Sequence, residues 1–439
     1  MALRARGVAA GDRVALVLPP GLAFARALHA CLLLGAVVVP VDVRLGSAER
    51  ALVCDGAALV LEEPLVQARS QDARQGRARQ GQAPAWETLG GEVVHDLDAV
   101  AAVIHTSGTS SAPRPVELTY GNFLWSALGS AVALDRDPRE RWLCALPVSH
   151  VGGLSILVRS VIYATTAVVQ PRFDTELVMR ALREHDITLV SLVATTLQRL
   201  LDAGLRRSGA LRCALTGGGP VPDVLIARAI ACGVPVRLTY GLTEACSQVT
   251  TVPVASVERA AGASGGRRVH RVTPDVTAMQ DTPGHAGPPL FCTRVRVAED
   301  GEILVSGPTI APASLAGDGW LRTGDLGALD ADGCLRVTGR KADTILSGGE
   351  NVAPAEVEAV LEAHADVLEA AVLGRADERW GEAVVAIVVA HPGSDVQAAS
   401  LRAHCAERLA PYKVPKEIDL VRGPLPRTPS GKLLRRELT

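Results

Sequence analysis

The sequence predicts an α/β protein: a large N-terminal domain of parallel α/β subdomains with a small β subdomain, followed by a small mobile α+β C-terminal domain. Three observations lead to this prediction. A length of 439 residues exceeds one ordinary hydrophobic core. Short Val, Leu and Ile runs alternate with longer Ala-, Leu- and Arg-rich segments of helical period over much of the chain. Beyond residue 293 the pattern changes to alternating apolar and polar residues with tight turns.

Five apolar runs are predicted to be buried strands of a largely parallel sheet. They are residues 13–18, 99–105, 187–193, 211–216 and 234–240. Several end in clusters of Gly, Ser or Thr. Because ligands of open α/β sheets bind beyond the carboxyl ends of strands, these clusters are better site candidates than the same residues elsewhere.

Polar stretches and turns divide the rest of the large domain. Residues 70–84 and 260–284 are rich in Gly, Arg and other polar residues, and they are predicted to be surface loops. The turns at residues 299–301 (EDG) and 330–333 (DADG) predict antiparallel hairpins. A small β subdomain is therefore expected to follow the parallel one.

The C-terminal part begins a new compact unit of about 100 residues. Pro354 stands where a first helical turn would begin, and a second helix is predicted at residues 398–409. Residues 369–373 and 383–390 are predicted to be strands. We place the boundary at the charged, glycine-led segment 339–343, which suits a hinge and gives domains of residues 1–339 and 340–439.

Composition excludes several functional classes. With 48% hydrophobic and 21% charged residues and a net charge of −2, the chain suits a globular protein without a footprint for nucleic acid or an anionic membrane. The longest apolar run, residues 31–41, is far shorter than the ~20 residues that span a bilayer. Nine scattered cysteines without a CxxC pattern predict reduced thiols. We expect a cytoplasmic protein.

Five short motifs stand in a recognisable order. They are residues 105–111 (HTSGTSS), 240–244 (YGLTE), 323–325 (TGD), 339–340 (GR) and 426–433 (PRTPSGKL). In that order and at those separations the five motifs resemble the set found in the acyl-adenylate-forming superfamily of acyl-CoA synthetases, firefly luciferase and peptide-synthetase adenylation domains. The resemblance runs from about Gly11 to Leu438. It implies that the protein uses ATP and Mg²⁺ and, in the synthetases, CoA as co-substrate.

The first motif is a Ser/Thr-rich turn after a strand, an arrangement that cradles phosphate. By resemblance it binds ATP through Thr106, Ser107, Gly108, Thr109, Ser110 and Arg114. The chain departs from the family pattern at three places: Ser111 and Pro115 replace glycines, and Arg114 replaces lysine. Arginine keeps the positive charge, whereas Pro115 lacks an N–H donor and both glycine replacements restrict the backbone. We expect a stiffer phosphate loop.

The other motifs complete a nucleotide site by resemblance. A magnesium triphosphate requires a hard carboxylate, a hydroxyl donor and a planar face for adenine. The family assigns these roles to Glu244, Thr243 and Tyr240, in that order. Gly217, Gly218 and Gly219 would allow close backbone approach to adenine. Asp325 would accept hydrogen bonds from both ribose hydroxyls, and Arg340 would donate to the same sugar.

Lys432 lies on a loop built from Pro, Ser and Gly near the end of the sequence. The resemblance implies that its ammonium stabilises the charge that develops when a carboxylate attacks the α-phosphate. Since Lys432 belongs to the smaller predicted domain, adenylation requires domain closure. In the family a rotation of the small domain then removes this lysine and opens a path for CoA.

Three further segments point to one branch of the family. Residues 142–160, 243–248 and 347–352 resemble o-succinylbenzoate–CoA ligases of menaquinone biosynthesis. Such a substrate has two carboxylates, of which the succinyl one is activated. The residues proposed to bind the acid are Arg159 for the aromatic carboxylate, Ser247 as a weaker helper, and His150, which gates or lines the acyl pocket and contacts the carboxylate. His150 and Thr243 are counted with Lys432 as catalytic candidates. The alternatives are a surface-paired helix-face arginine for Arg159 and a packed imidazole for His150.

Other functions stay open at this point. The acid could be a different aryl or fatty acid, or the acceptor a carrier protein. A non-enzymatic alternative is a degenerate nucleotide-binding paralogue, suggested by the altered phosphate loop, although retention of Glu244, Asp325, Arg340 and Lys432 argues against it. The partners are then a small carboxylic acid, ATP and CoA. A homodimer is compatible with the sequence.

We predict that Ser111→Gly combined with Pro115→Gly lowers KM for ATP or raises kcat, because glycines let the loop wrap the leaving pyrophosphate. The added unfolded-state entropy should cost about 1 kcal/mol of stability. Steady-state kinetics and thermal melting measure both effects. Unchanged or worse ATP kinetics in a folded double variant would identify Ser111 and Pro115 as adaptations of this enzyme.

Overall fold

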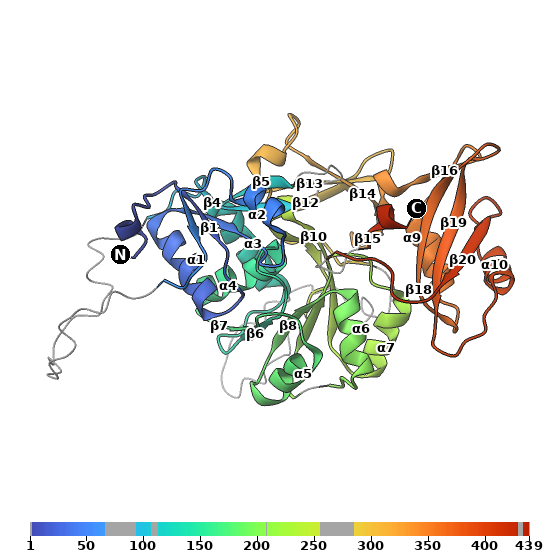
Figure 1. Ribbon diagram of the computed structural model, residues 1–439, viewed down its shortest axis with the longest axis horizontal. Helices are drawn as coiled ribbons and strands as arrows, with labels where there is room; N and C mark the ends of the chain where they lie inside the picture. Colours follow the sequence, from blue (N-terminus) through green and yellow to red (C-terminus); the bar gives the residue numbers. More distant parts are fainter. Residues whose placement is uncertain are drawn as a thin grey trace, which may run out of the picture.

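The computed structural model describes residues 2–65, 94–106, 113–207, 209–254, 285–428 and 433–438. Within these residues the strands form four sheets that follow one another along the chain. Figure 1 shows the N-terminal sheet at the left and the C-terminal sheet at the right. Mainly parallel sheets come first, an antiparallel sheet follows, and an α+β unit comes last, which confirms the predicted fold class.

The first sheet is mainly parallel. Its strand order is β3-β1-β2-β4-β5, and the last pair, β4 with β5, is antiparallel. Its strands are β1 (Arg13–Leu16), β2 (Val37–Pro40), β3 (Leu59–Leu61), β4 (Val100–Thr106) and β5 (Arg114–Thr119). The short helix η1 (Arg4–Arg6) precedes β1, and the connecting helices are α1 (Leu22–Leu34) and α2 (Ser47–Cys54).

The second sheet has the order β11-β10-β9-β8-β6-β7 and is parallel except for the β10–β11 pair. Its strands are β6 (Arg141–Cys144), β7 (Thr166–Val169), β8 (Leu189–Leu192), β9 (Cys213–Thr216), β10 (Val236–Leu242) and β11 (Ser247–Thr251). The accompanying helices are α3 (Tyr120–Ala133), α4 (Val151–Tyr163), α5 (Thr175–Glu184), α6 (Ala194–Asp202), α7 (Asp223–Ala231) and η4 (Thr243–Ala245).

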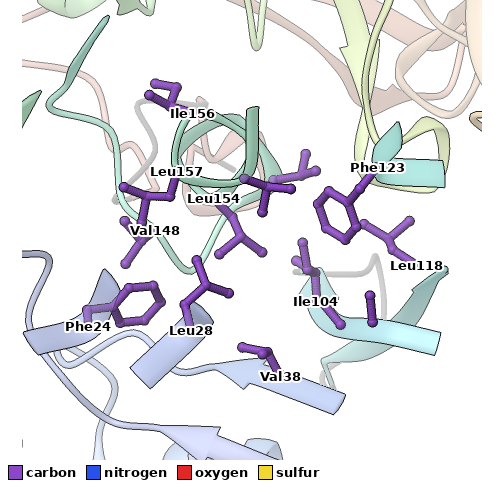
Figure 2. Close-up of a cluster of buried hydrophobic side chains, with 14 of the residues drawn as sticks. Phe24, Leu28, Val38, Ile104, Leu118, Phe123, Val148, Leu154, Ile156 and Leu157 are labelled. Atoms are coloured by element: carbon purple, nitrogen blue, oxygen red, sulfur yellow. The ribbon is translucent and has the colours of Figure 1, made fainter. Parts of the chain in front are cut away.

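One hydrophobic core joins these two sheets. It contains Phe24 and Leu28 of α1, Ile104 of β4 and Leu154 of α4, together with residues of the second sheet such as Trp142. Figure 2 shows α4 with Leu154 and Leu157 directed toward Leu28 and the strands of the first sheet. Nearly every residue in the first three turns of α4 is buried. This helix is therefore an internal element, and a polar side chain on it lies inside the protein.

The third sheet consists of antiparallel strands in the order β12-β13-β14-β15. Its strands are β12 (Arg294–Val297), β13 (Glu302–Ser306), β14 (Leu321–Leu329) and β15 (Leu335–Arg340), and the short helices η5 (Pro312–Ser314) and η6 (Lys341–Asp343) accompany them. The predicted turns at residues 299–301 and 330–333 join β12 to β13 and β14 to β15. Both predicted hairpins are thus confirmed.

The fourth sheet forms the C-terminal α+β unit. Its strands are β16 (Ile345–Ser347), β17 (Glu350–Val352), β18 (Val367–Asp377), β19 (Gly381–Ala390) and β20 (Glu417–Val421). Its helices are α9 (Pro354–Glu362), α10 (Ala398–Ala406) and η7 (Arg435–Glu437). Val357 and Leu361 of α9 pack with Leu401 of α10 against the sheet. Pro354 is the first helical residue, as predicted.

The predicted strands are all present, but three of them begin two residues later than the apolar runs that predicted them. They are β8, β9 and β10. The leading residues Ile187, Leu211 and Val234 are nevertheless buried. An apolar run in the sequence indicates which residues are buried. Residues just before a strand can be buried without belonging to its hydrogen-bonded ladder, so the run is longer than the strand. The predicted loops at 70–84 and 260–284 lie outside the described residues, and the domain boundary at 339–340 stays a prediction.

Two other expectations concern cysteines and membranes. All nine cysteines are free, and six of them are buried, as expected for reduced thiols in a core. Of the helices in the described ranges, none is long and apolar enough to cross a bilayer.

The C-terminal unit contains a carboxyl group that should make stability depend on pH. Burial, together with Glu358 and Glu369 nearby, raises the pKa of Glu362 to about 7, against an ordinary value of 4.5. A raised carboxyl pKa favours folding below pH 4.5, and this contribution is lost as the pH rises toward 7. We predict that Glu362→Gln increases the free energy of unfolding at pH 8 by on the order of 2 kcal/mol more than it does at pH 5.

Chemical denaturation at the two pH values measures this change. Glu378→Gln, at an exposed position of the same unit, is the matched control and should shift neither midpoint. An equal effect of Glu362→Gln at pH 5 and pH 8 would contradict the assignment.

Candidate active site

Several of the predicted nucleotide-binding residues lie at or near the ends of strands. Gly217 follows β9, and Tyr240 lies near the end of the neighbouring strand β10. Asp325 and Arg340 are paired residues of β14 and β15. The carboxyl ends of parallel strands meet at one edge of a sheet, so the fold brings the adenine-binding candidates together.

Asp325 joins two of these candidates directly. Tyr240 Oη donates a hydrogen bond to Asp325 Oδ2 at 2.8 Å, and Arg340 Nε pairs with Oδ1 at 2.9 Å. Asp325 is buried, whereas the Arg340 side chain is 44% exposed. Burial, with the negative charge of Asp325, raises the pKa of the Tyr240 phenol, so this group stays a donor. A carboxylate has about four acceptor sites, which leaves room for sugar hydroxyls.

Gly217 is required by a close approach of two backbones. A Cβ at this position would lie 2.5 Å from the carbonyl oxygen of Thr239 and 2.7 Å from its Cγ2. Gly218 has a φ of +82°, in the left-handed region that favours glycine. Gly219 has open space around it. The three glycines thus differ: the first two have local structural reasons, and the third is free to serve a ligand.

The second motif forms a tight turn between β10 and β11. Thr243 and Glu244 lie on η4, and Ala245 is fully buried beneath them. Cys246 and Ser247 then adopt positive φ values of +50° and +99°, which are unusual for residues with side chains. The Glu244 side chain is half-buried, and no described residue donates a hydrogen bond or forms an ion pair with its carboxylate.

The strands on either side of the predicted phosphate loop, β4 and β5, pair antiparallel. Thr106, the last residue of β4, pairs with Arg114, the first of β5, and Thr106 Oγ1 donates to the Arg114 carbonyl at 3.4 Å. Arg114 is exposed at this base. The antiparallel strand β5 after the loop was missed by the sequence analysis. Four predicted ATP-binding residues lie outside the described part of the chain: Ser107, Gly108, Thr109 and Ser110.

His150 occupies the N-cap position of α4, where its side chain makes no capping hydrogen bond, and it is half-buried. Burial is the main cause that lowers the pKa of its imidazole, and Arg44 acts in the same direction, whereas Asp42 opposes them. The imidazole is therefore neutral at pH 7. A neutral ring at a helix start can accept or donate one hydrogen bond without adding charge.

Arg159 is 3% exposed, so the alternative of a surface-paired arginine is wrong. Nη1 donates to Gln248 Oε1 and Nη2 to Ser126 Oγ, both at 2.8 Å. The guanidinium lies over the ring of Trp142, 5.8 Å from its centroid. In the described part of the chain no carboxylate pairs with this buried cation. The hydroxyl that contacts it belongs to Ser126, and the helper role of Ser247 stays a prediction.

Lys432 also lies outside the described residues, but both ends of its loop are anchored. Leu434 N donates to the Pro426 carbonyl at 2.9 Å, closing the loop. Arg427 pairs with Glu369 of β18 at 2.6 Å, and Arg435 binds the Glu358 carboxylate of α9. The segment that carries the lysine is thereby attached to the C-terminal unit at two points.

Sequence reasoning missed the partners of Arg159. Ser126 lies on α3 among apolar residues, and nothing in its sequence context marks it. Gln248 is the last residue of the 243–248 segment that indicated the family branch, so the resemblance of this segment could have identified Gln248 as a candidate. Two cavities of the described part of the chain, one beside α5 and one between α1 and α4, are lined by none of the predicted site residues.

The fold and these residues define an adenylate-forming enzyme. The family model described as AMP-binding enzyme matches residues 1–314, and that of the AMP-binding enzyme C-terminal domain matches residues 356–432. The chain belongs to the AMP-binding enzyme family.

Among its members, the chain is similar to 2-succinylbenzoate–CoA ligases. It is 38% identical to that of Bacillus licheniformis, covering 99% of this chain and 91% of the relative. The enzyme of Geobacillus kaustophilus is 39% identical over 98% of this chain and 88% of the relative.

Solved structures give the same picture. The o-succinylbenzoate CoA synthetase of Bacillus subtilis with the acyl-adenylate intermediate has a TM-score of 0.81 at 35% identity, with 100% of this chain and 90% of that chain covered. Its complex with ATP and magnesium has a TM-score of 0.80 over 100% and 91%. A double mutant bound to the product analogue OSB-NCoA has a TM-score of 0.64 over 100% and 90%. By TM-score, the structure of this chain is therefore more similar to the adenylate complex than to the complex with the product analogue.

We predict that Gly217→Ala destabilises the protein by about 1–3 kcal/mol, because the new methyl group would displace the Thr239 backbone. Gly219 has open space around it and serves as the matched control. Gly219→Ala should change the free energy of unfolding by less than about 1 kcal/mol. Thermal melting without nucleotide tests both variants. Equal melting temperatures for Gly217→Ala and wild type would show that β9 and β10 are not closely packed there.

Proposed function

We propose that this protein is an ATP-dependent 2-succinylbenzoate–CoA ligase. In the first half-reaction a substrate carboxylate attacks the α-phosphate of ATP, giving acyl-AMP and pyrophosphate. In the second, the CoA thiol attacks the acyl carbonyl and AMP leaves with the bonding electrons, giving the thioester. The main structural support is the buried guanidinium of Arg159, which has no acidic partner among the described residues, in a chain whose near full-length relatives are such ligases.

The nucleotide is proposed to bind across the second and third sheets. Tyr240 would face adenine, the glycines 217–219 would border it, and Asp325 with Arg340 would bind the ribose. Glu244 fits a Mg²⁺ ligand, since its half-buried carboxylate has no partner among the described residues and Mg²⁺ prefers oxygen ligands. When bound, Mg²⁺ would neutralise phosphate charge.

The phosphate-binding groups are proposed from sequence and supported by position. Thr106 and Arg114 lie at the base of the loop that carries Ser107, Gly108, Thr109 and Ser110. Thr243 would donate its hydroxyl to the α-phosphate. The Lys432 ammonium would lie where negative charge accumulates during attack, which stabilises the transition state more than the ground state.

Domain rearrangement is proposed to separate the two half-reactions. We infer a large domain of residues 1–339 and a small one of residues 340–439. Lys341, at the junction, pairs with Asp300 at 2.7 Å and Glu302 at 3.2 Å on the large side. Asp343, two residues on, pairs with Arg435 at 3.5 Å. The two ends of η6 therefore contact different units, which supports a hinge at this helix.

The acid is proposed to bind along α4. Arg159 would pair with the aromatic carboxylate, which does not react, and Ser247 would assist. His150 at the helix start would contact the reacting carboxylate, and its neutral state avoids a competing ion pair with the acid. The two carboxylates would then be held by the N-cap residue of one buried helix and by a residue of its third turn.

One assay separates this proposal from its rivals. ATP–pyrophosphate exchange should depend on 2-succinylbenzoate and respond much less to simple aryl or fatty acids. CoA, but not a carrier protein, should then release AMP. Exchange with another acid alone would favour a different acid–CoA ligase, and no exchange with any acid would favour a degenerate nucleotide-binding paralogue. We further propose a cytoplasmic location, and size measurement in solution tests for a homodimer.

We predict that Lys432→Ala slows adenylation by on the order of 10² to 10⁴ but largely spares thioester formation from added acyl-AMP. The ammonium is needed only while charge develops at the α-phosphate. Single-turnover assays of each half-reaction test this, with the neighbouring Arg427→Ala as a control for loop anchoring. Equal losses in both half-reactions of Lys432→Ala would refute the role.

A further inference from the structure

The guanidinium of Arg159 retains donors that the protein does not use. A guanidinium has five N–H groups. Two of them bind Gln248 and Ser126. The Nε atom is buried and has no hydrogen-bond partner. A buried donor without an acceptor is costly, so this one fits the oxygen of a bound ligand.

Gln248 is fixed so that its oxygen faces the cation. Its Nε2 donates to Thr251 Oγ1 at 2.8 Å, and Thr251 Oγ1 donates in turn to the Thr250 carbonyl at 2.7 Å. Arginine can only donate, so the amide oxygen must point to Arg159 and the amide nitrogen to Thr251. Gln248 is 2% exposed, and bonds at both ends of its amide allow one orientation.

Among the described residues, the hydrogen-bond network around Arg159 contains no negative charge. The partners of Arg159 are an amide, a hydroxyl and an indole face, all of them neutral. Neutral partners orient a cation without cancelling its charge. A glutamate would fit the space of Gln248 and would neutralise the guanidinium, since the two side chains are already 2.8 Å apart. Burying a cation without a counter-ion is unfavourable unless a ligand supplies the anion.

We propose that Gln248 determines substrate specificity by holding Arg159 in place while leaving its charge free for the second carboxylate of a dicarboxylic acid. This inference rests on the proposed function, because it deepens the role of Arg159 in acid binding. Gln248 is a positioning residue: it acts through Arg159 and need not touch the substrate.

The decisive variant is Gln248→Glu, compared on two acids that differ by one group: 2-succinylbenzoate and 4-oxo-4-phenylbutanoate, which lacks the ring carboxylate. The new carboxylate should occupy Arg159 and repel the diacid. We expect KM for the diacid to rise about tenfold to hundredfold. The constants for the monoacid and KM for ATP should stay within about threefold of wild type, so that the ratio of kcat/KM for the two acids falls. General damage to the fold would lower both acids together.

Two further variants keep the outcomes distinct. Gln397→Glu, at an exposed position, adds the same charge and should leave the ratio unchanged. Arg159→Ala should abolish the preference for the diacid. If Arg159→Ala keeps the preference, the proposed acid pocket is wrong. If Arg159→Ala loses it but Gln248→Glu does not, the role of Gln248 alone is overturned.

Should melting curves show that Gln248→Glu does not fold, Gln248→Leu replaces it. Leucine removes the acceptor without adding charge, so Arg159 loses its anchor. The ratio should then fall about threefold or more while the monoacid constants hold. An unchanged ratio in a folded Gln248→Leu variant would also overturn the proposal.

Discussion

The arrangement of the site depends on the two contacts made by the Asp325 carboxylate. This carboxylate receives the Tyr240 hydroxyl from the second sheet and the Arg340 guanidinium from the end of the third. A buried carboxylate with two donors resists separation from either of them, because each loss would leave a buried charge less compensated. The strand β10, which carries Tyr240, is thereby linked to β15, the strand that leads into the C-terminal unit.

The fold was predictable to the extent that local patterns determine it. Apolar runs located the strands, and turn residues located both hairpins of the third sheet. The strand β5 was missed because residues 114–119 contain proline, arginine and glutamate, and their pairing with β4 arises from tertiary contact. Pattern matching identified Asp325 and Arg340 as candidates, but their contact with each other depends on the register of β14 and β15.

The acid-binding candidates show a different limit. Arg159 was ambiguous in sequence, since an arginine on a helix is most often solvated. Its burial follows from α4 lying between two sheets, which no local pattern reveals. Ser126 and Gln248 come from elements far apart in the chain and converge only because α3, α4 and β11 meet in the core. Long-range polar contacts of this kind require the folded structure.

The turn from Thr243 to Gln248 has a consequence for how such enzymes diverge. Within six residues it carries the metal-binding candidate Glu244, two residues with left-handed backbone, and the anchor of Arg159. Gly241 faces the Ser247 carbonyl so closely that no side chain fits between them. Substitutions that change the backbone of this turn would disturb activation chemistry and acid selection together, whereas a side-chain change at Gln248 acts through Arg159 on the acid alone. Lineages acquiring new acids should therefore accumulate changes on α3 and α4 and at Gln248, where selection can act on the substrate without altering the use of ATP.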